Sequence, residues 1–119
     1  MTWALILALV RHVPQEDRAT RAGQWQVSVG EGLNGKVLGV IGLGNLGFQV
    51  ATIGKAFGMS LLAWSQNLTA ERVAQYGATL VSKDEPLSQS DIVTIHLVLS
   101  ARTRGLIGVR ELGLMQRTA

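Results

Sequence analysis

The stretch that decides the fold is Val37-Leu38-Gly39-Val40-Ile41-Gly42-Leu43-Gly44-Asn45-Leu46-Gly47. Its first five residues are apolar and mostly β-branched or aliphatic, which predicts a short buried strand. Three glycines then follow at the spacing G-x-G-x-x-G, and residues 48–58 have the apolar spacing of a helix. The pattern therefore predicts a strand and a helix joined by a turn made almost wholly of glycine.

Each glycine of this turn has a separate physical role. Gly42 permits the tight turn, Gly44 lets the backbone approach a phosphate without a Cβ in the way, and Gly47 lets the helix pack closely on the strand. The new helix offers free N–H groups and the positive end of its dipole to an anion. We therefore expect Gly42 to Gly47, with the amides of Asn45 and Leu46, to bind the pyrophosphate of a dinucleotide. A purely structural turn stays the alternative, because a chain with 14 glycines can produce this spacing by chance.

The segments after the turn extend this unit. Residues 48–58 predict a helix that Gly58 ends, and the apolar strand Leu61–Trp64 follows at once. We expect the helix to bury one face, made of Val50, Ala51, Ile53, Ala56 and Phe57. Strand, turn, helix and strand then form a right-handed βαβ unit.

The rest of the chain repeats the alternation of strand and helix. Further strands are expected at residues 78–81 and 91–96, and helical segments at residues 69–76, around Pro86 and Leu87, and at residues 109–115. Four alternating strands predict an α/β fold with a doubly wound, Rossmann-like parallel sheet of order 3-2-1-4. The fourth strand then stands at an unfinished edge, so we expect the 119 residues to be a fragment of a longer enzyme.

The chain before the first strand has a different character. Thr2 to His12 predicts a helix that is apolar on most sides, and a second, polar helix follows from Pro14 to Ala22. The change of pattern predicts a helical segment at residues 1–25 and a separate strand-and-helix part at residues 26–119.

Composition excludes several classes of protein. The net charge of +3 comes from scattered residues without a basic run, which argues against a nucleic-acid partner. The apolar run Trp3–Val10 is far shorter than the roughly 20 residues that cross a bilayer, so no membrane role is expected. The absence of cysteine suits the reducing cytoplasm, and neither histidine has a partner at metal-ligand spacing, so we predict no metal site.

Several blocks, in order along the chain, resemble the D-isomer-specific 2-hydroxyacid dehydrogenases. The blocks are Thr2–Leu9, Gly23–Trp25, Leu33–Lys36, Gly39–Gly47, Ala56–Met59, Ser90–Leu97 and Thr103–Gly108. The resemblance implies a two-domain, commonly dimeric enzyme that transfers a hydride between a nicotinamide and a D-2-hydroxy acid or 2-keto acid. It also implies that residues 1–25 form a helical entry and dimerisation segment and residues 26–119 a partial NAD(P)-binding domain. The alternative is that the first helix packs on the chain's own sheet. In the family a histidine acts as acid and base, an acidic residue tunes it, and an arginine holds the substrate carboxylate. These three lie beyond the position matching Ala119, so we expect no catalytic residue in this chain and no activity from it as it stands.

The resemblance also assigns residues at the end of the fourth strand. His96, Leu97 and Val98 correspond to the segment that lines the nicotinamide side of the cofactor, where family members usually carry a proline at the position of Val98. For His96, a packed histidine and a proton shuttle stay as alternatives. Thr103 is expected near the cofactor as well, where with Ser100 it would cap a short helix around Arg104.

The choice between NAD and NADP depends on the end of the second strand. A carboxylate there normally accepts hydrogen bonds from the adenosine ribose. The matching position is Ser65, and Ser65-Gln66-Asn67 offers short polar groups that carry no charge to repel a 2′-phosphate. The nearest arginine in sequence, Arg72, lies inside the next predicted helix, and for Arg102 and Arg104 a solvated surface charge is the favoured reading over a phosphate contact. We therefore expect tolerance of both nicotinamides with a lean toward NADP, unless Ser65 only begins a loop.

Two other functions compete with the dehydrogenase hypothesis. The chain could be a non-catalytic module that senses nicotinamide nucleotides and presents a dimer surface, or it could be a nonfunctional remnant. Whether the chain serves an enzyme is therefore left open by the residues alone.

Overall fold

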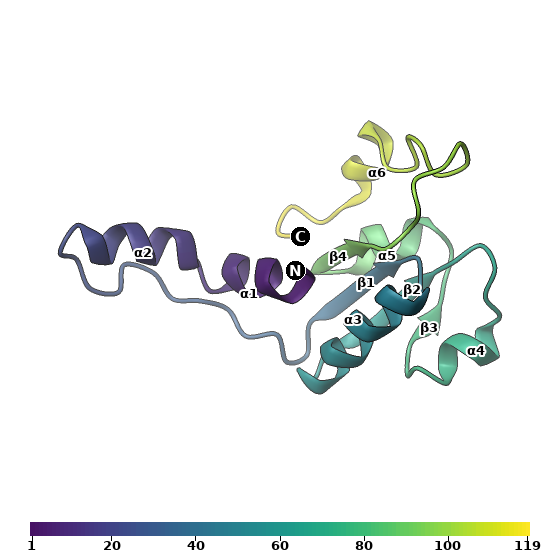
Figure 1. The fold of residues 1–119 in the computed structure, drawn as a ribbon, viewed down its shortest axis with the longest axis horizontal. Helices are drawn as coiled ribbons and strands as arrows, with labels where there is room; N and C mark the ends of the chain where they lie inside the picture. The colour runs from purple at the N-terminus through teal and green to yellow at the C-terminus, as the bar shows by residue number, and fades with distance from the viewer. The chain divides into compact units, whose positions relative to one another are not determined.

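The computed structural model describes all of residues 1–119, which divide into two compact units, Met1–Leu33 and Asn34–Ala119. Figure 1 shows the order of the elements along the chain. None of the helices is both long and apolar enough to cross a membrane.

The first unit contains the two predicted helices, α1 (Thr2–Val10) and α2 (Val13–Arg21). His12 joins them in the left-handed conformation, with φ of 53°, so the chain breaks after the first helix as the nearby proline predicts. Ile6 is buried, whereas Leu5 and Leu9 are 63% and 70% exposed. Apart from Ile6, α1 therefore buries little of its apolar surface.

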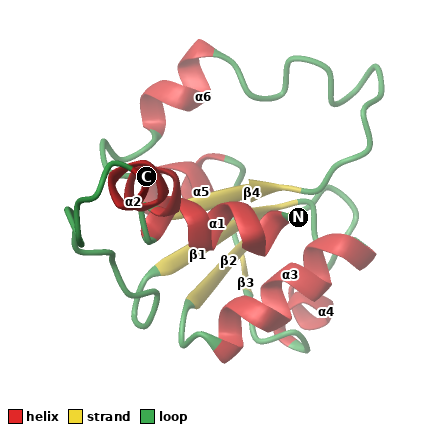
Figure 2. Ribbon diagram, turned by 60° about the vertical axis from the view of Figure 1, so that its left-hand side comes forward, coloured by secondary structure: helices red, strands yellow, loops and turns green.

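The second unit is a four-stranded parallel sheet with helices on both faces, shown in Figure 2. The strands are β1 (Val37–Ile41), β2 (Ser60–Trp64), β3 (Thr79–Leu80) and β4 (Ile92–Ile95), and the helices are α3 (Asn45–Ala56), α4 (Ala70–Ala74), α5 (Asp84–Gln89) and α6 (Val109–Leu114). The strand order is β3-β2-β1-β4, which confirms the predicted α/β topology and leaves β4 at an edge.

The order of the strands follows from three crossovers. The connections through α3 and α4 move the chain from β1 to β2 and on to β3, and the connection through α5 carries it back to β4, beyond β1. Because crossovers between parallel strands share the right-handed sense, α3 and α5 cover opposite faces of the sheet (Figure 2). β1 lies between them, and Leu38, Val40 and Ile41 at its centre are fully buried.

The buried face of α3 differs from the predicted one. Ile53 and Phe57 are 43% and 39% exposed, and Ala56 is exposed too. The face that packs on the sheet is instead made of Gly47, Val50, Ala51 and Gly54. These residues follow the spacing of one helical stripe, and the two glycines let the helix backbone lie close to the strands, where larger side chains would hold it away.

Two predicted elements are shorter or absent. β3 spans two residues in place of the four predicted, because only Thr79 and Leu80 pair with β2. No helix forms around Arg104, so the prediction that Ser100 and Thr103 cap one was wrong. The segment between β4 and α6 is a turn in which the amides of Thr103 and Arg104 both donate to the Ser100 carbonyl oxygen.

Candidate functional site

The glycine turn joins β1 to α3 at the carboxyl ends of the parallel strands. Gly42 has φ of +93°, and a Cβ there would lie 2.7 Å from the carbonyl oxygen of His96. A Cβ at Gly47 would overlap the Gly42 carbonyl oxygen. The fold itself therefore requires glycine at both positions.

Gly44 is different from the other two glycines. It is exposed, its backbone is extended with φ of −77°, and a Cβ added to it would meet no atom of the chain within 4 Å. Nothing in the chain itself requires glycine here. The open space beside Gly44 is consistent with a ligand that approaches the backbone closely.

The amino-terminal end of α3 is available to an anion. Gly44 precedes the helix as its N-cap, and no side chain caps this end. The first helical hydrogen bond of α3 is donated by the Phe48 amide to the Gly44 carbonyl oxygen, at 2.8 Å. The amides of Asn45, Leu46 and Gly47 precede any helical acceptor, so they and the helix dipole can bind a phosphate.

Hydrogen bonds at the strand ends bring two other segments to the turn. The Gly42 amide donates to the Trp64 carbonyl oxygen at 2.8 Å, which extends the pairing of β1 with β2. The His96 amide donates to the Ile41 carbonyl oxygen at 2.8 Å, which extends the pairing with β4. The end of β2 and the end of β4 therefore flank the glycine turn.

A hollow of about 310 Å³ lies between these segments, and we call it the polar hollow because six of its nine lining residues are polar or charged. It brings together six of the residues predicted to bind cofactor: Ser65, Gln66, Asn67, Leu97, Val98 and Thr103. Trp64, Ser100 and Arg102 line it as well. Sequence reasoning did not assign these three to the cofactor site.

The predicted residues of the turn and His96 do not line this hollow. Leu97 connects the two regions, because a Cβ at Gly42 would lie 2.6 Å from the Leu97 Cδ2 atom. The glycine turn and the polar hollow are therefore neighbours at the carboxyl ends of the strands.

Thr103 fixes the turn that forms one wall of the hollow. Its Oγ1 atom accepts a hydrogen bond from the Ser100 amide at 2.8 Å and donates to the Val98 carbonyl oxygen at 2.7 Å. The hydroxyl therefore holds the backbone from 98 to 103 in one arrangement. This is a structural role for a residue that was predicted to contact cofactor.

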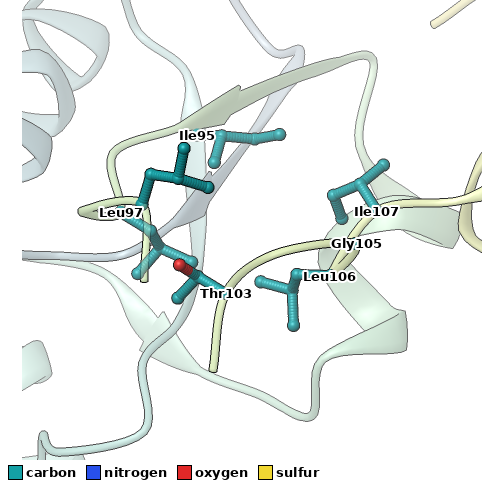
Figure 3. A pocket seen from close by; sticks show the side chains of 7 residues that line it. Ile95, Leu97, Thr103, Gly105, Leu106 and Ile107 are labelled. Atoms are coloured by element: carbon teal, nitrogen blue, oxygen red, sulfur yellow. The ribbon is translucent and has the colours of Figure 1, made fainter. Parts of the chain in front are cut away.

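A second hollow of about 240 Å³ lies beside the first and is mainly apolar. Figure 3 shows Ile95 and Leu97 at one side of it and Leu106 and Ile107 at the other, with Thr103 between them. It shares Leu97 and Thr103 with the polar hollow. None of the three turn glycines lines it, so we do not place the phosphates there.

His96 lies at the end of β4, half-buried. Its Nε2 atom is 2.9 Å from the Thr94 Oγ1 atom, and burial lowers the pKa of the imidazole from its ordinary value. Burial therefore favours the neutral form of the ring. No carboxylate is bonded to it, so it lacks the partner that would tune an acid–base histidine.

An ion pair between Lys83 and Glu111 holds the carboxyl-terminal end of the segment that joins β4 to α6. Lys83 Nζ donates to Glu111 Oε1 at 2.8 Å and to the Leu106 carbonyl oxygen at 3.3 Å. Glu111 Oε2 accepts from the Gly108 amide at 3.1 Å. The Lys83 ammonium, the first of several causes, lowers the pKa of the Glu111 carboxyl to about 2. Residues 98–108 are thus held by hydrogen bonds at both ends.

The chain matches, over residues 3–119, the family described as D-isomer specific 2-hydroxyacid dehydrogenase, NAD binding domain. It belongs to this family. The glyoxylate reductase of Aeropyrum pernix is 43% identical over 127 residues, which cover 99% of this chain and 38% of that protein.

Solved structures agree with this assignment. The phosphoglycerate oxidoreductase of Vibrio cholerae has a TM-score of 0.89 and 34% identity over 96% of this chain and 38% of that one. The D-lactate dehydrogenase of Aquifex aeolicus, solved with NAD and lactic acid, has a TM-score of 0.86 and 35% identity over 97% of this chain and 35% of that one. The chain spans well under half the length of the curated relatives it matches.

The site meets the physical requirements of the dinucleotide that defines this NAD-binding family. The uncapped helix end and the open space at Gly44 suit a pyrophosphate. On the β2 side, the polar hollow is lined by the uncharged hydrogen-bonding side chains of Ser65, Gln66 and Asn67, where an adenosine ribose lies in doubly wound folds. The residues present therefore fit a nicotinamide dinucleotide.

Proposed function

We propose that this chain forms the nicotinamide-dinucleotide site of an oxidoreductase that interconverts a D-2-hydroxy acid and a 2-keto acid. When bound, the nicotinamide supplies the group that gives or accepts a hydride. The observation that carries the proposal is the open space at Gly44 beside an uncapped helix end. The names of the relatives, such as glyoxylate reductase, support the substrate class.

In this proposal, different groups of residues bind different parts of the dinucleotide. The amides of Asn45, Leu46 and Gly47 hold the pyrophosphate, while Ser65, Gln66 and Asn67 hydrogen-bond the adenosine ribose. His96, Leu97 and Val98 line the nicotinamide side, as the family resemblance implies, and Leu97 and Val98 border the polar hollow as well. The acid–base histidine, its acidic partner and the carboxylate-binding arginine come from outside these 119 residues in this proposal, so the chain binds and orients but carries no catalytic residue.

We propose that the site accepts both NAD and NADP. Binding of NAD follows from the family, and acceptance of NADP is supported by the absence of any carboxylate around the polar hollow. A carboxylate at the end of β2 would repel a 2′-phosphate, and Ser65 does not. A preference of a hundredfold or more for NADH over NADPH, measured as dissociation constants, would overturn this part of the proposal.

We also propose that residues 1–25 form a dimerisation segment in front of a nucleotide-binding domain at residues 26–119. Leu5, Leu9 and Trp25 are more than half exposed, so the segment presents apolar surface that a second copy of the chain could cover. The alternative, that α1 packs on the chain's own sheet, predicts a monomer. Light scattering after size-exclusion chromatography distinguishes the two.

The competing hypothesis of a non-catalytic nucleotide sensor has no observation in its favour, because the similar proteins carry the names of enzymes. We place the protein in the cytoplasm, since a chain with no cysteine needs no oxidising compartment.

Two measurements test the proposed function. Titrating the 119-residue chain with NADH, followed by the fluorescence of the reduced nicotinamide, should show saturable binding. The product of the complete reading frame, mixed with NADH or NADPH, should then consume the reduced cofactor when glyoxylate, hydroxypyruvate or pyruvate is added. Binding without turnover of any of the three acids would favour the sensor, and no binding would leave the glycine turn a purely structural one.

A further inference from the structure

Arg102 lines the polar hollow together with Ser65, Gln66 and Asn67. In sequence it is far from the end of β2, and a solvated surface charge was the favoured prediction for it. The fold places it at the hollow because the segment after β4 runs past the end of β2. Arg104, two residues further on, is exposed and does not line the hollow.

Arg102 is the only charged residue in the lining of this hollow. Two other arginines of the chain form ion pairs: Arg21 with Asp17, and Arg110 with Asp84 and Glu111. Arg102 makes no hydrogen bond or ion pair through its side chain. Its guanidinium is therefore available to an anion that enters the hollow.

The backbone that carries Arg102 is held in place although the side chain is not. The Thr103 hydroxyl bonds to the Ser100 amide and the Val98 carbonyl oxygen, and Lys83 holds the Leu106 carbonyl oxygen. A charged side chain on a fixed turn can meet a ligand without first ordering its own backbone, and this lowers the entropic cost of binding.

The ligand chemistry follows from what surrounds the arginine. The end of β2 is where the 2′ position of an adenosine ribose lies, and Ser65 stands there without a carboxylate. A phosphate on that position is a dianion near neutral pH, and the planar guanidinium binds a phosphate with two parallel hydrogen bonds.

We propose that Arg102, which comes from the segment after β4 and not from the end of β2, binds the 2′-phosphate of NADP(H) and sets the cofactor selectivity of this site. The inference rests on the proposed function, since it assumes that the adenosine half of a dinucleotide occupies the polar hollow. It assigns a selectivity role to a residue outside the segment that usually carries it.

The test compares dissociation constants for NADPH and NADH in the full chain and in two variants. Arg102→Gln should weaken NADPH binding about tenfold and leave NADH binding within about twofold, because only NADPH carries the group that the guanidinium binds. Arg104→Gln removes another exposed arginine from the same turn, one that does not line the hollow, and should change neither constant. Both arginines are exposed, so circular dichroism spectra of the variants should match that of the parent chain.

A further variant changes the opposite side of the polar hollow, at the end of β2. Ser65→Asp places a carboxylate at the end of β2 and should lower NADPH affinity while NADH binding is kept or improved. If Arg102→Gln leaves NADPH affinity unchanged, or if Arg104→Gln lowers it as much, the assignment of Arg102 is wrong while NADH binding still upholds the proposed function. If neither nucleotide binds the parent chain, the proposed function fails, and the inference fails with it.

Discussion

The two parts of the candidate site are built in different ways. The glycine turn consists of backbone that is fixed by the sheet and by the start of α3, and two of its three glycines are needed for the fold itself. The polar hollow is a rim of exposed or half-buried side chains on two loops. Under the proposed function, substitutions at Gly42 or Gly47 affect folding and phosphate binding together, whereas substitutions in the polar hollow, or at the open position Gly44, can change binding without harm to the fold.

The largest effect is expected at Gly47, where fold and site are least separable. Gly47→Ala should destabilise the chain by about 3 kcal/mol, because its Cβ would overlap the Gly42 carbonyl oxygen. Helix propensity alone predicts the opposite sign, a gain of roughly 1 kcal/mol. Urea unfolding measures the change.

Gly113→Ala is the matched control for this substitution. Gly113 also lies within a helix, α6, but a Cβ there meets nothing within 4 Å. Alanine should therefore stabilise the chain there by about 0.5–1 kcal/mol. Equal gains at both positions would show that the turn is not closely packed.

A smaller effect, confined to binding, is expected at Gly44. Gly44→Asp should leave the urea midpoint unchanged or raised, because aspartate is a good N-cap and the position has an extended backbone and open space. The same carboxylate occupies the phosphate position and repels it, so NADH affinity should fall at least about a hundredfold, or about 2.7 kcal/mol.

Gly44→Asn separates charge from shape in this experiment. It fills the same space and caps the helix without the charge, so the loss of NADH affinity should be smaller, about tenfold. If both variants bind NADH as tightly as the parent chain does, the pyrophosphate is not bound at the glycine turn. The proposed division of binding between the glycine turn and the polar hollow would then be wrong.

The smallest effect concerns the ion pair between Lys83 and Glu111, which holds the segment that carries Arg102. Glu111 has a pKa of about 2 in the folded chain and 4.5 as its ordinary value, with the Lys83 ammonium as the first cause. Because the unfolded chain takes up this proton at higher pH, the stabilisation is complete above pH 4.5 and is lost as the pH falls toward 2. The difference in urea midpoint between the parent chain and Glu111→Gln should shrink across this window.

Lys83→Met provides the comparison for that measurement. In its background the pH dependence contributed by Glu111 should be clearly reduced, since the ammonium that lowers the carboxyl pKa is gone. An unchanged profile would mean that the Gly108 amide, and not Lys83, controls the carboxyl group and the end of the segment.

The sequence predicted the fold well where local patterns are sufficient. Glycine spacing, the apolar strand before it and the helix after it identified the turn, and right-handed crossovers then limited the sheet to one strand order. The prediction for α3 failed at Ile53 and Phe57 because apolar residues were taken to mark the buried face, whereas glycines form part of it.

The sequence alone determined that this chain has a doubly wound sheet and a glycine turn of the dehydrogenase family, because both depend on residues close together along the chain. Only the tertiary structure brought Arg102 to the same hollow as Ser65 and paired Lys83 with Glu111, 28 residues away. Contacts between loops depend on where each strand ends and how the following segment turns. Strand pairing and hydrogen bonds across the fold decide that geometry, and no local spacing in the sequence encodes it.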